Sequence, residues 1–312
     1  MKRFVPTLLA SVLAIGLVAC SKQGPESTPA ASGSAPAADS GGATVGLSIS
    51  TLNNPFFVTL RDGAQAEASK DGITLITVDA HNDPAKQIAS VEDLIQKKVK
   101  VILINPTDSD AVAGVVKQAT AAGIPVVSLD RSVNGAEVVS HIASDNVAGG
   151  KLAGEFLLEK LGGKGNIVEL QGVAGTSAAR ERGQGFHLAV DGKDGVKVVA
   201  SQPADFDRAK GLSVTENILQ GNKDVQGIFA HNDEMALGAQ KAVEAAGLKN
   251  VAIVGFDATP DAVAAVKAGT LAATVQQKPE LIGQYGVQTA KKLIDGQAVD
   301  KSIPVPLDLV KP

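Results

Sequence analysis

Two acidic and two basic residues stand out among the side chains that could do chemistry. Asp130 is followed directly by Arg131, and the pair comes at the end of an apolar run. Asp257 ends a second apolar run, and Arg182 lies near the start of a predicted helix. Carboxylates and guanidinium groups form strong, charge-assisted hydrogen bonds. Because two acids and two bases balance in charge, such a set suits a neutral ligand better than a phosphate or a carboxylate.

Amide and aromatic side chains accompany these charges. They are Asn54, Asn105, Asn232 and Gln277, with Phe56, Phe57 and Phe206. Aromatic residues make up only 3% of the chain, so three of them near polar residues are informative. A sugar has hydroxyls around its rim, which need polar partners, and C–H groups on its faces, which need flat apolar surfaces. These residue types together predict a carbohydrate-binding site.

The elements that must position these residues alternate between strand and helix. Strands are expected over residues 45–50, 73–78, 101–104, 125–129, 166–170, 196–200, 227–230 and 251–256. Helices are expected after Asn54-Pro55 and Asp83-Pro84, where an N-cap residue precedes a proline, over 107–122, and from Asp233 to Gly247. This alternation predicts an α/β fold with doubly wound parallel sheets.

Two halves of the chain repeat the same placement of polar residues. Asn105 follows one strand and Asn232 follows another, 127 residues later. Asp130 and Asp257 end the next strand of each half, with the same separation of 127 residues. Equal offsets predict two lobes of one architecture. In open α/β sheets, ligands bind at the carboxyl ends of the strands, which is where these residues are expected.

The N-terminal segment indicates export. Residues 2 and 3 are basic, and the apolar run that follows ends in Leu17-Val18-Ala19-Cys20. Since Cys20 is the only cysteine, no internal disulfide or cysteine-based metal site is possible. Residues 1–19 are interpreted as a lipoprotein signal peptide because the run resembles a bacterial lipobox, with Cys20 as the lipidated residue. Residues 20–43, rich in Ser, Pro, Ala and Gly, are interpreted as a flexible linker.

Longer stretches of the sequence resemble one family. They include Ser50-Thr-Leu-Asn-Asn-Pro-Phe-Phe57, Ile104-Asn-Pro-Thr-Asp-Ser-Asp110, Val139-Ser-His-Ile-Ala-Ser-Asp-Asn146 and Asn232-Asp-Glu-Met-Ala236. From about Thr44 onward the chain resembles the periplasmic ribose-binding proteins of bacteria, which are periplasmic binding proteins of type I. The resemblance implies two Rossmann-like lobes joined by a three-segment hinge.

The resemblance also implies a role for each residue at a matching position. The ligand-binding residues it implies are Asn54, Phe56, Phe57, Asn105, Asp130, Arg131, Arg182, Phe206, Asn232, Asp257 and Gln277. Two neighbours depart from the family pattern: His231 stands where a Gln is usual, and Gln276 where a small apolar residue is usual. We expect little effect from either. No cofactor and no metal are expected, and the four His show no metal-ligand spacing.

The resemblance further implies lobe boundaries and partners. The N-terminal lobe is expected over 44–144 and 278–304, and the C-terminal lobe over 145–277 and 305–312. The ligand is expected to be D-ribose or a related monosaccharide such as allose or xylose. Expected partners are an ABC permease, a chemoreceptor and, through the lipid, the membrane. The chain is expected to be a monomer, in the periplasm or on the outer leaflet of the plasma membrane.

Other interpretations of these residues remain open from sequence alone. Phe56 and Phe57 could be core residues, and Asp130 and Asp257 could be helix N-caps. A glycosidase could use the two Asp as its carboxylate pair, but we expect the neighbouring arginines to keep both ionised, which disfavours an acid catalyst. A DNA-binding repressor would need an N-terminal helix-turn-helix, where this chain has an export signal. The net charge of −4 also disfavours nucleic-acid binding.

Overall fold

The computed structural model describes residues 42–312. The expected signal peptide, Cys20 and nearly all of the expected linker lie outside these residues. Within residues 42–312, no helix is both long enough and apolar enough to span a bilayer. In the same range, no three His, Cys, Asp or Glu side chains are grouped so that they could hold a metal ion.

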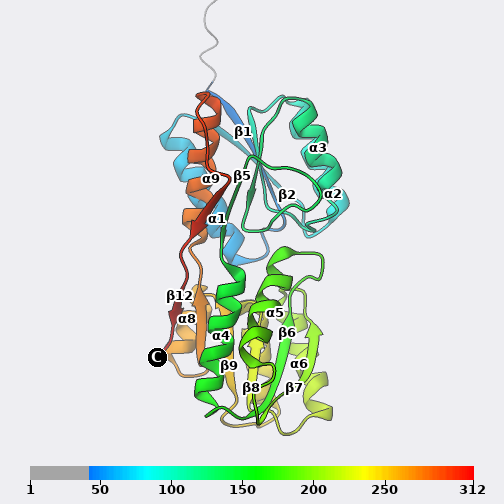
Figure 1. Cartoon of the computed structure of the whole chain (residues 1–312), viewed down its shortest axis with the longest axis vertical. Helices are drawn as coiled ribbons and strands as arrows, with labels where there is room; N and C mark the ends of the chain where they lie inside the picture. Colours follow the sequence, from blue (N-terminus) through cyan, green and yellow to red (C-terminus); the bar gives the residue numbers. More distant parts are fainter. Residues whose placement is uncertain (1–41) are drawn as a thin grey trace, which may run out of the picture. The chain divides into compact units, whose positions relative to one another are not determined.

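The first lobe is a six-stranded sheet with helices on both faces (Figure 1). Its elements are β1 (Thr44–Ile49), α1 (Pro55–Lys70), β2 (Thr74–Asp79), α2 (Pro84–Gln96), β3 (Val101–Ile104), α3 (Ala113–Ala121), β4 (Val126–Leu129), β5 (Ser140–Ser144), α9 (Pro279–Ile294) and β11 (Ser302–Val305). The strand order is β11-β5-β4-β3-β1-β2, and every pair is parallel.

The second lobe repeats this design with the intervening chain. Its elements are α4 (Asn146–Lys160), β6 (Gly165–Gln171), α5 (Ser177–Val190), β7 (Val196–Pro203), α6 (Arg208–Gly221), β8 (Gly227–Ala230), α7 (Asp233–Ala245), β9 (Ala252–Asp257), α8 (Pro260–Lys267), β10 (Ala273–Gln276) and β12 (Asp308–Val310). The order is β12-β10-β9-β8-β6-β7. The predicted two-lobed α/β class is confirmed, although the edge strand β12 runs antiparallel to β10.

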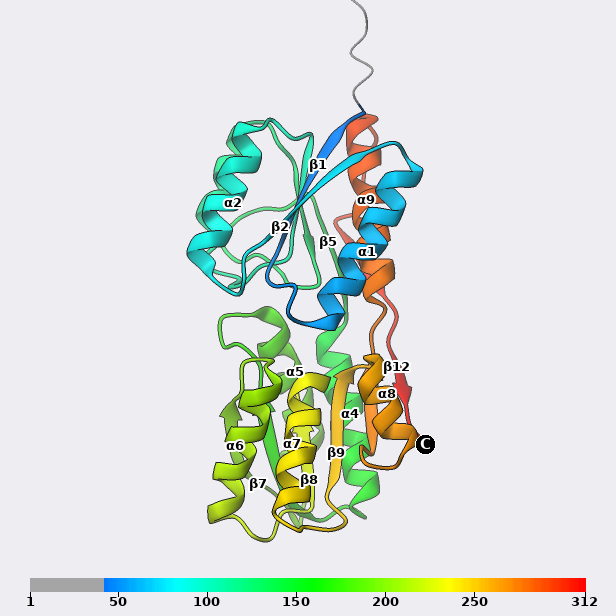
Figure 2. The same ribbon diagram turned by 180° about the vertical axis from the view of Figure 1, so that it is seen from behind.

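The chain passes between the two sheets three times (Figures 1 and 2). It crosses between β5 and α4, between β10 and α9, and between β11 and β12. As a result, the first lobe is completed by α9 and β11, which follow every element of the second lobe except β12 in sequence.

Local sequence explains where the helices begin. The Asn54 side chain accepts a hydrogen bond from the Phe56 N–H at 2.9 Å, and Asp83 caps α2 in the same way. The expected helix over 107–122 is wrong in its first turns, since α3 starts only at Ala113. The reason is local: the Asp108 side chain accepts hydrogen bonds from the backbone N–H groups of Asp110 and Ala111, and the chain forms a turn there instead of a helix.

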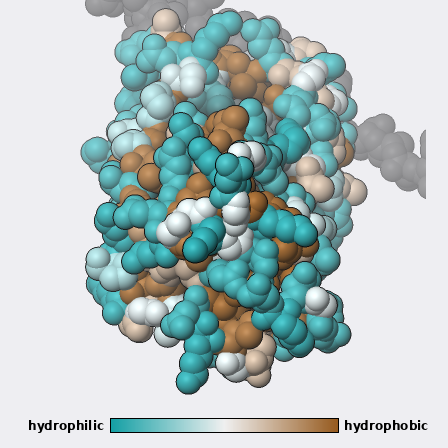
Figure 3. Space-filling model, turned by 60° about the horizontal axis from the view of Figure 1, so that its bottom comes forward, coloured by the Kyte–Doolittle hydropathy of each residue, from teal (hydrophilic) through white to brown (hydrophobic). Residues whose placement is uncertain are grey.

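Apolar side chains fill both faces of each sheet. In the first lobe, α1 and α9 pack on one face and α2 and α3 on the other; in the second, α4 and α5 face α6, α7 and α8 across the sheet. With the second lobe turned forward, the surface is largely hydrophilic, and its hydrophobic residues form small separate patches (Figure 3). Among residues 42–312, the exposed large hydrophobic side chains are Val139 and Leu188.

Candidate functional site

A small cavity lies where the carboxyl ends of strands from both lobes meet. The lining residues are Asn54, Phe56, Phe57, Asp130, Arg131, Ala178, Arg182, Phe206, Asn232 and Asp257. Nine of the eleven expected ligand-binding residues are therefore together around one space. Ala178, at the start of α5, was not expected, because a small apolar side chain carries no chemical signal in a sequence.

Two of the lining amides also begin helices. Asn54 caps α1, and Asn232 caps α7 through a 3.0 Å hydrogen bond from the Met235 N–H. Neither aspartate has the capping role considered for it: Thr259 occupies the N-cap position of α8, without a capping hydrogen bond, and Asp130 lies before no helix. Each asparagine uses its side-chain oxygen for the cap, which leaves its NH₂ group as a donor; that of Asn232 donates to the Phe206 carbonyl at 3.3 Å.

The first lobe contributes a buried acid–base pair. The Arg131 Nε lies 3.8 Å from the Asp130 Oδ2, and both side chains are almost fully buried. Arg131 also donates from Nη1 to the Pro106 carbonyl at 2.9 Å. The Asp130 Oδ1 and the Arg131 Nε are buried without a hydrogen-bond partner. Because such groups are costly to leave unpaired, they indicate a polar ligand that supplies both a donor and an acceptor.

The second lobe contributes a matching pair. The Arg182 Nη1 lies 3.6 Å from the Asp257 Oδ1, and both side chains are again buried. Arg182 donates from Nε to the Asn146 Oδ1 at 2.9 Å and from Nη1 to the His231 carbonyl at 2.6 Å. The guanidinium group is therefore held from two sides. The site thus holds two acidic and two basic side chains, as its composition predicted.

Two expected ligand-binding residues do not line the cavity but support the aspartates that do. Asn105 donates to the Asp130 Oδ2 at 3.3 Å and to the Leu129 carbonyl at 3.1 Å. Gln277 donates from Nε2 to the Asp257 Oδ1 at 2.9 Å, and its own Oε1 is buried without a partner. Each lobe thus fixes its aspartate with an amide from a neighbouring strand.

Aromatic rings and guanidinium groups pack against one another in the site. Phe56 and Phe57 form an edge-to-face pair with their centroids 5.2 Å apart. The Arg131 guanidinium lies 5.0 Å from the Phe57 ring centre and 5.4 Å from that of Phe206. Phe56 and Phe57 are also part of the first lobe's core, so the core interpretation and the site interpretation both hold for these residues.

Three lining residues adopt a backbone conformation that favours glycine. The φ angle is 62° at Asp130, 118° at Asp257 and 59° at Phe206. Such conformations cost about 1–3 kcal/mol each and cluster at ligand sites, where the fold holds a side chain in place against its local preference. The strain therefore falls on an acid of each lobe and on the one aromatic residue that the second lobe contributes.

The charge state of the two aspartates differs from expectation. Burial raises the pKa of Asp130, although Arg131 and Arg182 oppose it. Burial likewise raises the pKa of Asp257 to about 7, against the attraction of Arg182 and a hydrogen bond from Gln277. The expectation that the arginines keep both carboxyls ionised is wrong, because removal from water outweighs the nearby positive charge. The argument that ionised aspartates disfavour an acid catalyst therefore does not hold for this site.

Glu181, on α5, is partly buried. Glu181 accepts a hydrogen bond from the Asn146 Nδ2 at 3.2 Å, and burial raises its pKa. Because Asn146 also holds Arg182, this carboxyl belongs to the support of the site.

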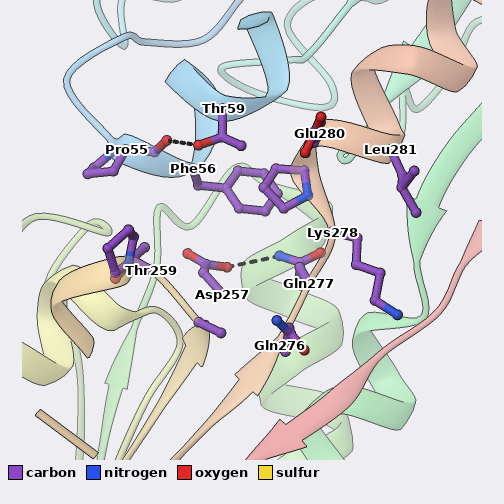
Figure 4. Close-up of a pocket in the computed structure, with 13 residues that line it drawn as sticks. Pro55, Phe56, Thr59, Asp257, Thr259, Gln276, Gln277, Lys278, Glu280 and Leu281 are labelled. Atoms are coloured by element: carbon purple, nitrogen blue, oxygen red, sulfur yellow. Dashed lines mark hydrogen bonds between the residues drawn. The ribbon is translucent and has the colours of Figure 1, made fainter. Parts of the chain in front are cut away.

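A wider pocket of about 860 Å³ opens beside the cavity (Figure 4). It lies along the crossing between β10 and α9 and shares Phe56 and Asp257 with the cavity. Figure 4 shows the hydrogen bond from Gln277 to Asp257 at its centre, with Lys278 and Glu280 farther along the crossing. Asp257 is thus reached from two sides, from the cavity and from this pocket.

Direct hydrogen bonds join the lobes at another edge of the cavity. The Ser109 N–H donates to the Gly175 carbonyl at 2.9 Å, and the Ser177 N–H donates to the Ser109 Oγ at 3.1 Å. The Ser132 N–H donates to the Ser177 Oγ at 2.9 Å. These bonds hold the start of α5 against loops of the first lobe, so the structure has the lobes in contact around the cavity.

Comparison with known proteins agrees with this geometry. Residues 45–298 match the family described as "Periplasmic binding protein domain". The chain belongs to the periplasmic binding protein family. Proteins of this family bind solutes for ABC importers and are not enzymes, so the chain is a binding protein, and the glycosidase alternative is excluded by family, not by pKa.

Individual members of the periplasmic binding protein family are closely similar to the chain. It is 57% identical over 267 residues to a protein of Haemophilus influenzae named "Ribose import binding protein RbsB", covering 86% of this chain and 91% of that one. A protein of the same name from Bacillus subtilis is 49% identical over 310 residues, covering 99% of each. A solved ABC transporter solute-binding protein from Bacillus halodurans with bound myo-inositol is 35% identical with a TM-score of 0.84, covering 88% of this chain and 96% of that one.

Proposed function

We propose that this protein binds D-ribose in the cavity between its lobes and delivers it to an ABC permease. The observation that carries the proposal is the pair of buried Asp–Arg sets, with the unpaired Asp130 Oδ1 and Arg131 Nε beside the lining aromatics. A neutral, polyhydroxylated ligand satisfies such groups without adding a net charge. The high identity to ribose import proteins favours D-ribose over allose or xylose, which are the alternative ligands.

The transport role requires the lobes to open and close. We propose that the three crossings, near Ser144-Asp145, Gln277-Lys278 and 304–307, form the hinge, which sets the lobe boundaries expected from sequence. A sugar that contacts both lobes favours the closed form, because it makes its full set of contacts only there. The closed form would be the state recognised by the permease and by a chemoreceptor.

Calorimetric titration of the purified full-length chain tests the ligand. D-ribose should bind at micromolar or lower concentration, and more tightly than D-allose or D-xylose. Asp257→Ala should weaken binding by about 2 kcal/mol or more, because ribose and Arg182 lose a buried acceptor. Asp62→Ala, which removes an exposed carboxylate on α1, should leave affinity unchanged. No heat with D-ribose at these concentrations would contradict the ribose assignment.

We also propose that the protein is a monomer anchored outside the cytoplasm by a lipid on Cys20. The lone cysteine at the end of the apolar leader supports the anchor, and an acyl chain contributes about 0.8 kcal/mol of membrane affinity per buried CH₂. The small number of exposed large hydrophobic side chains in residues 42–312 supports a monomer. Cys20→Ser should move the protein from the membrane fraction to the soluble fraction; a variant that stays with the membrane would contradict the anchor.

A further inference from the structure

A buried carboxylate lies behind the second-lobe side of the cavity. Glu169, on β6, is fully buried and accepts hydrogen bonds from four side chains. The donors are His231 at 2.9 Å, Gln171 at 3.2 Å, His187 at 3.3 Å and Ser201. Burial alone would raise the pKa of Glu169, but these hydrogen bonds, that of His231 first, lower it to about 2. None of the five residues lines the cavity.

His231 is held on both nitrogens of its ring. Its Nδ1 accepts a hydrogen bond from the Gly172 N–H at 3.3 Å, and its Nε2 lies 2.9 Å from the Glu169 Oε1. An acceptor Nδ1 and a carboxylate opposite Nε2 require the neutral ring with its proton on Nε2. Burial lowers the pKa of His231, which favours the same neutral form. The ring is therefore fixed in both orientation and tautomer.

Two contacts connect this ring to the cavity wall. The His231 carbonyl accepts the 2.6 Å hydrogen bond from the Arg182 Nη1. The backbone of Gly172 lies against the far end of the Phe206 ring, because a Cβ at Gly172 would lie 2.0 Å from the Phe206 Cζ. Through its main chain and through Gly172, His231 thus reaches both Arg182 and Phe206, which line the cavity.

We propose that His231 is a positioning residue of the sugar site: clamped between Glu169 and Gly172, it fixes Arg182 and Phe206 in the geometry that binds the ligand. The proposal rests on the proposed sugar-binding function. It changes the expectation that the His at this position has little effect. A Gln at this position could make the same two contacts, since an amide can donate to Glu169 and accept from Gly172.

Calorimetry on full-length variants tests the positioning role. His231→Leu removes both ring contacts and should weaken ribose binding at least tenfold, whereas His231→Gln should stay within about threefold of the wild type. His187→Leu is the matched control, because it removes another hydrogen bond to Glu169 but touches neither Arg182 nor Phe206; it should change affinity less than threefold. Wild-type affinity in His231→Leu would overturn the proposal, as would equal losses in His187→Leu and His231→Leu.

A second measurement does not depend on ribose or on the folding of the leucine variant. Nitrogen-15 NMR of the wild-type imidazoles at neutral pH should show His231 as the neutral tautomer protonated on Nε2. A ring protonated on Nδ1, or on both nitrogens, would overturn the clamp. If the wild type binds no sugar, the proposed function fails, while the NMR result still decides whether His231 is held as described.

Discussion

Asp257 is under opposing influences from burial, from Arg182 and from a second acid. Asp233 lies behind it and accepts hydrogen bonds from Thr259 and Thr274, and its pKa is raised by burial and by the nearby Asp257 charge. Two adjacent buried carboxyls do not ionise independently. The ligand-free site therefore holds at least part of its acid in the neutral form near neutral pH, and this gives a testable pH dependence.

The substitution Asp257→Asn should remove a pH-dependent penalty from the ligand-free protein. Because the pKa of Asp257 is about 7 when folded and 3.8 in its ordinary state, the folded form binds more protons between these values. Stability contributed by this residue is then present below pH 3.8 and lost as pH rises toward 7. The free energy of unfolding of Asp257→Asn, relative to that of the wild type, should be about 1–4 kcal/mol higher at pH 8 than at pH 5.

Thermal or urea unfolding of both proteins without sugar, across this pH range, measures the difference. A constant difference between the two proteins at all pH values would show that Asp257 is ionised throughout. Asp62→Asn, at an exposed carboxylate, serves as the control and should show no such trend.

At the level of single residues, the sequence indicated which residues would line the cavity, but not how deeply each would be buried or what it would contact. The motifs identified nine of the residues that line the cavity, because these motifs lie near the ends of strands or the starts of helices. The pKa of Asp257 depends on how deeply it is buried, which no local pattern encodes. The His231–Glu169 contact joins residues 62 positions apart, so their pairing was likewise not visible before the fold.

Among the elements, α5 carries Arg182 and must approach α4 closely. At Gly150 on α4, a Cβ would lie 2.1 Å from the Arg182 carbonyl oxygen, and at Gly185 on α5 a Cβ would lie 2.0 Å from the Val147 oxygen. The two backbones meet without intervening side chains. The position of Arg182 in the cavity is thus set by glycines at the helix contact.

The substitution Gly150→Ala should push α5 away from α4 and displace Arg182. The obstacle is backbone rather than a flexible side chain, so overpacking should cost about 1–3 kcal/mol of stability. Sugar affinity should fall at least tenfold, measured by calorimetry on protein that still unfolds cooperatively.

Gly114→Ala in α3 is the matched control. Nothing lies within 4 Å of the Cβ that it would add, so alanine's higher helix propensity should stabilise the protein by about 0.5–1 kcal/mol without changing affinity. If the two variants had the same effect on binding, the close helix contact would not be what positions Arg182.

The eight expected strands followed from the sequence because proline, capping residues and short β-prone runs are local signals, whereas β5, β10, β11 and β12 were not expected. The start of α3 did not follow, because the turn at Asp108 competes with helix over the same residues. The direction of β12 also escaped prediction. It is a three-residue strand whose orientation depends on the crossing that precedes it.

In the whole molecule, the lobes touch through the hydrogen bonds of Ser109, Ser132 and Ser177 at the edge of the cavity. These bonds exist only when the lobes are together. They therefore add to the stability of the closed form, and they should slow the release of a sugar held inside it.

Removing one of these bonds should speed ligand release. Ser177→Ala deletes the acceptor for the Ser132 N–H, whose loss costs about 1 kcal/mol, equivalent to a several-fold increase in dissociation rate. Stopped-flow measurement of ribose release gives the rate. Ser213→Ala, which removes an exposed hydroxyl on α6, should leave the rate unchanged. Identical release from Ser177→Ala and the wild type would mean that these contacts do not stabilise closure.

The second pass of the chain between the lobes has a consequence for the order in which the protein is made. Helix α9 supplies Ile282, Val287 and Ala290 to the core beside β1, and β11 completes the same sheet. The first lobe therefore lacks part of its core until α9 and β11 have been synthesised, after nearly all of the second lobe. This delay keeps the early part of the chain unfolded for longer. For a member of a family that works outside the cytoplasm, an unfolded, extended chain is the form that can cross a membrane.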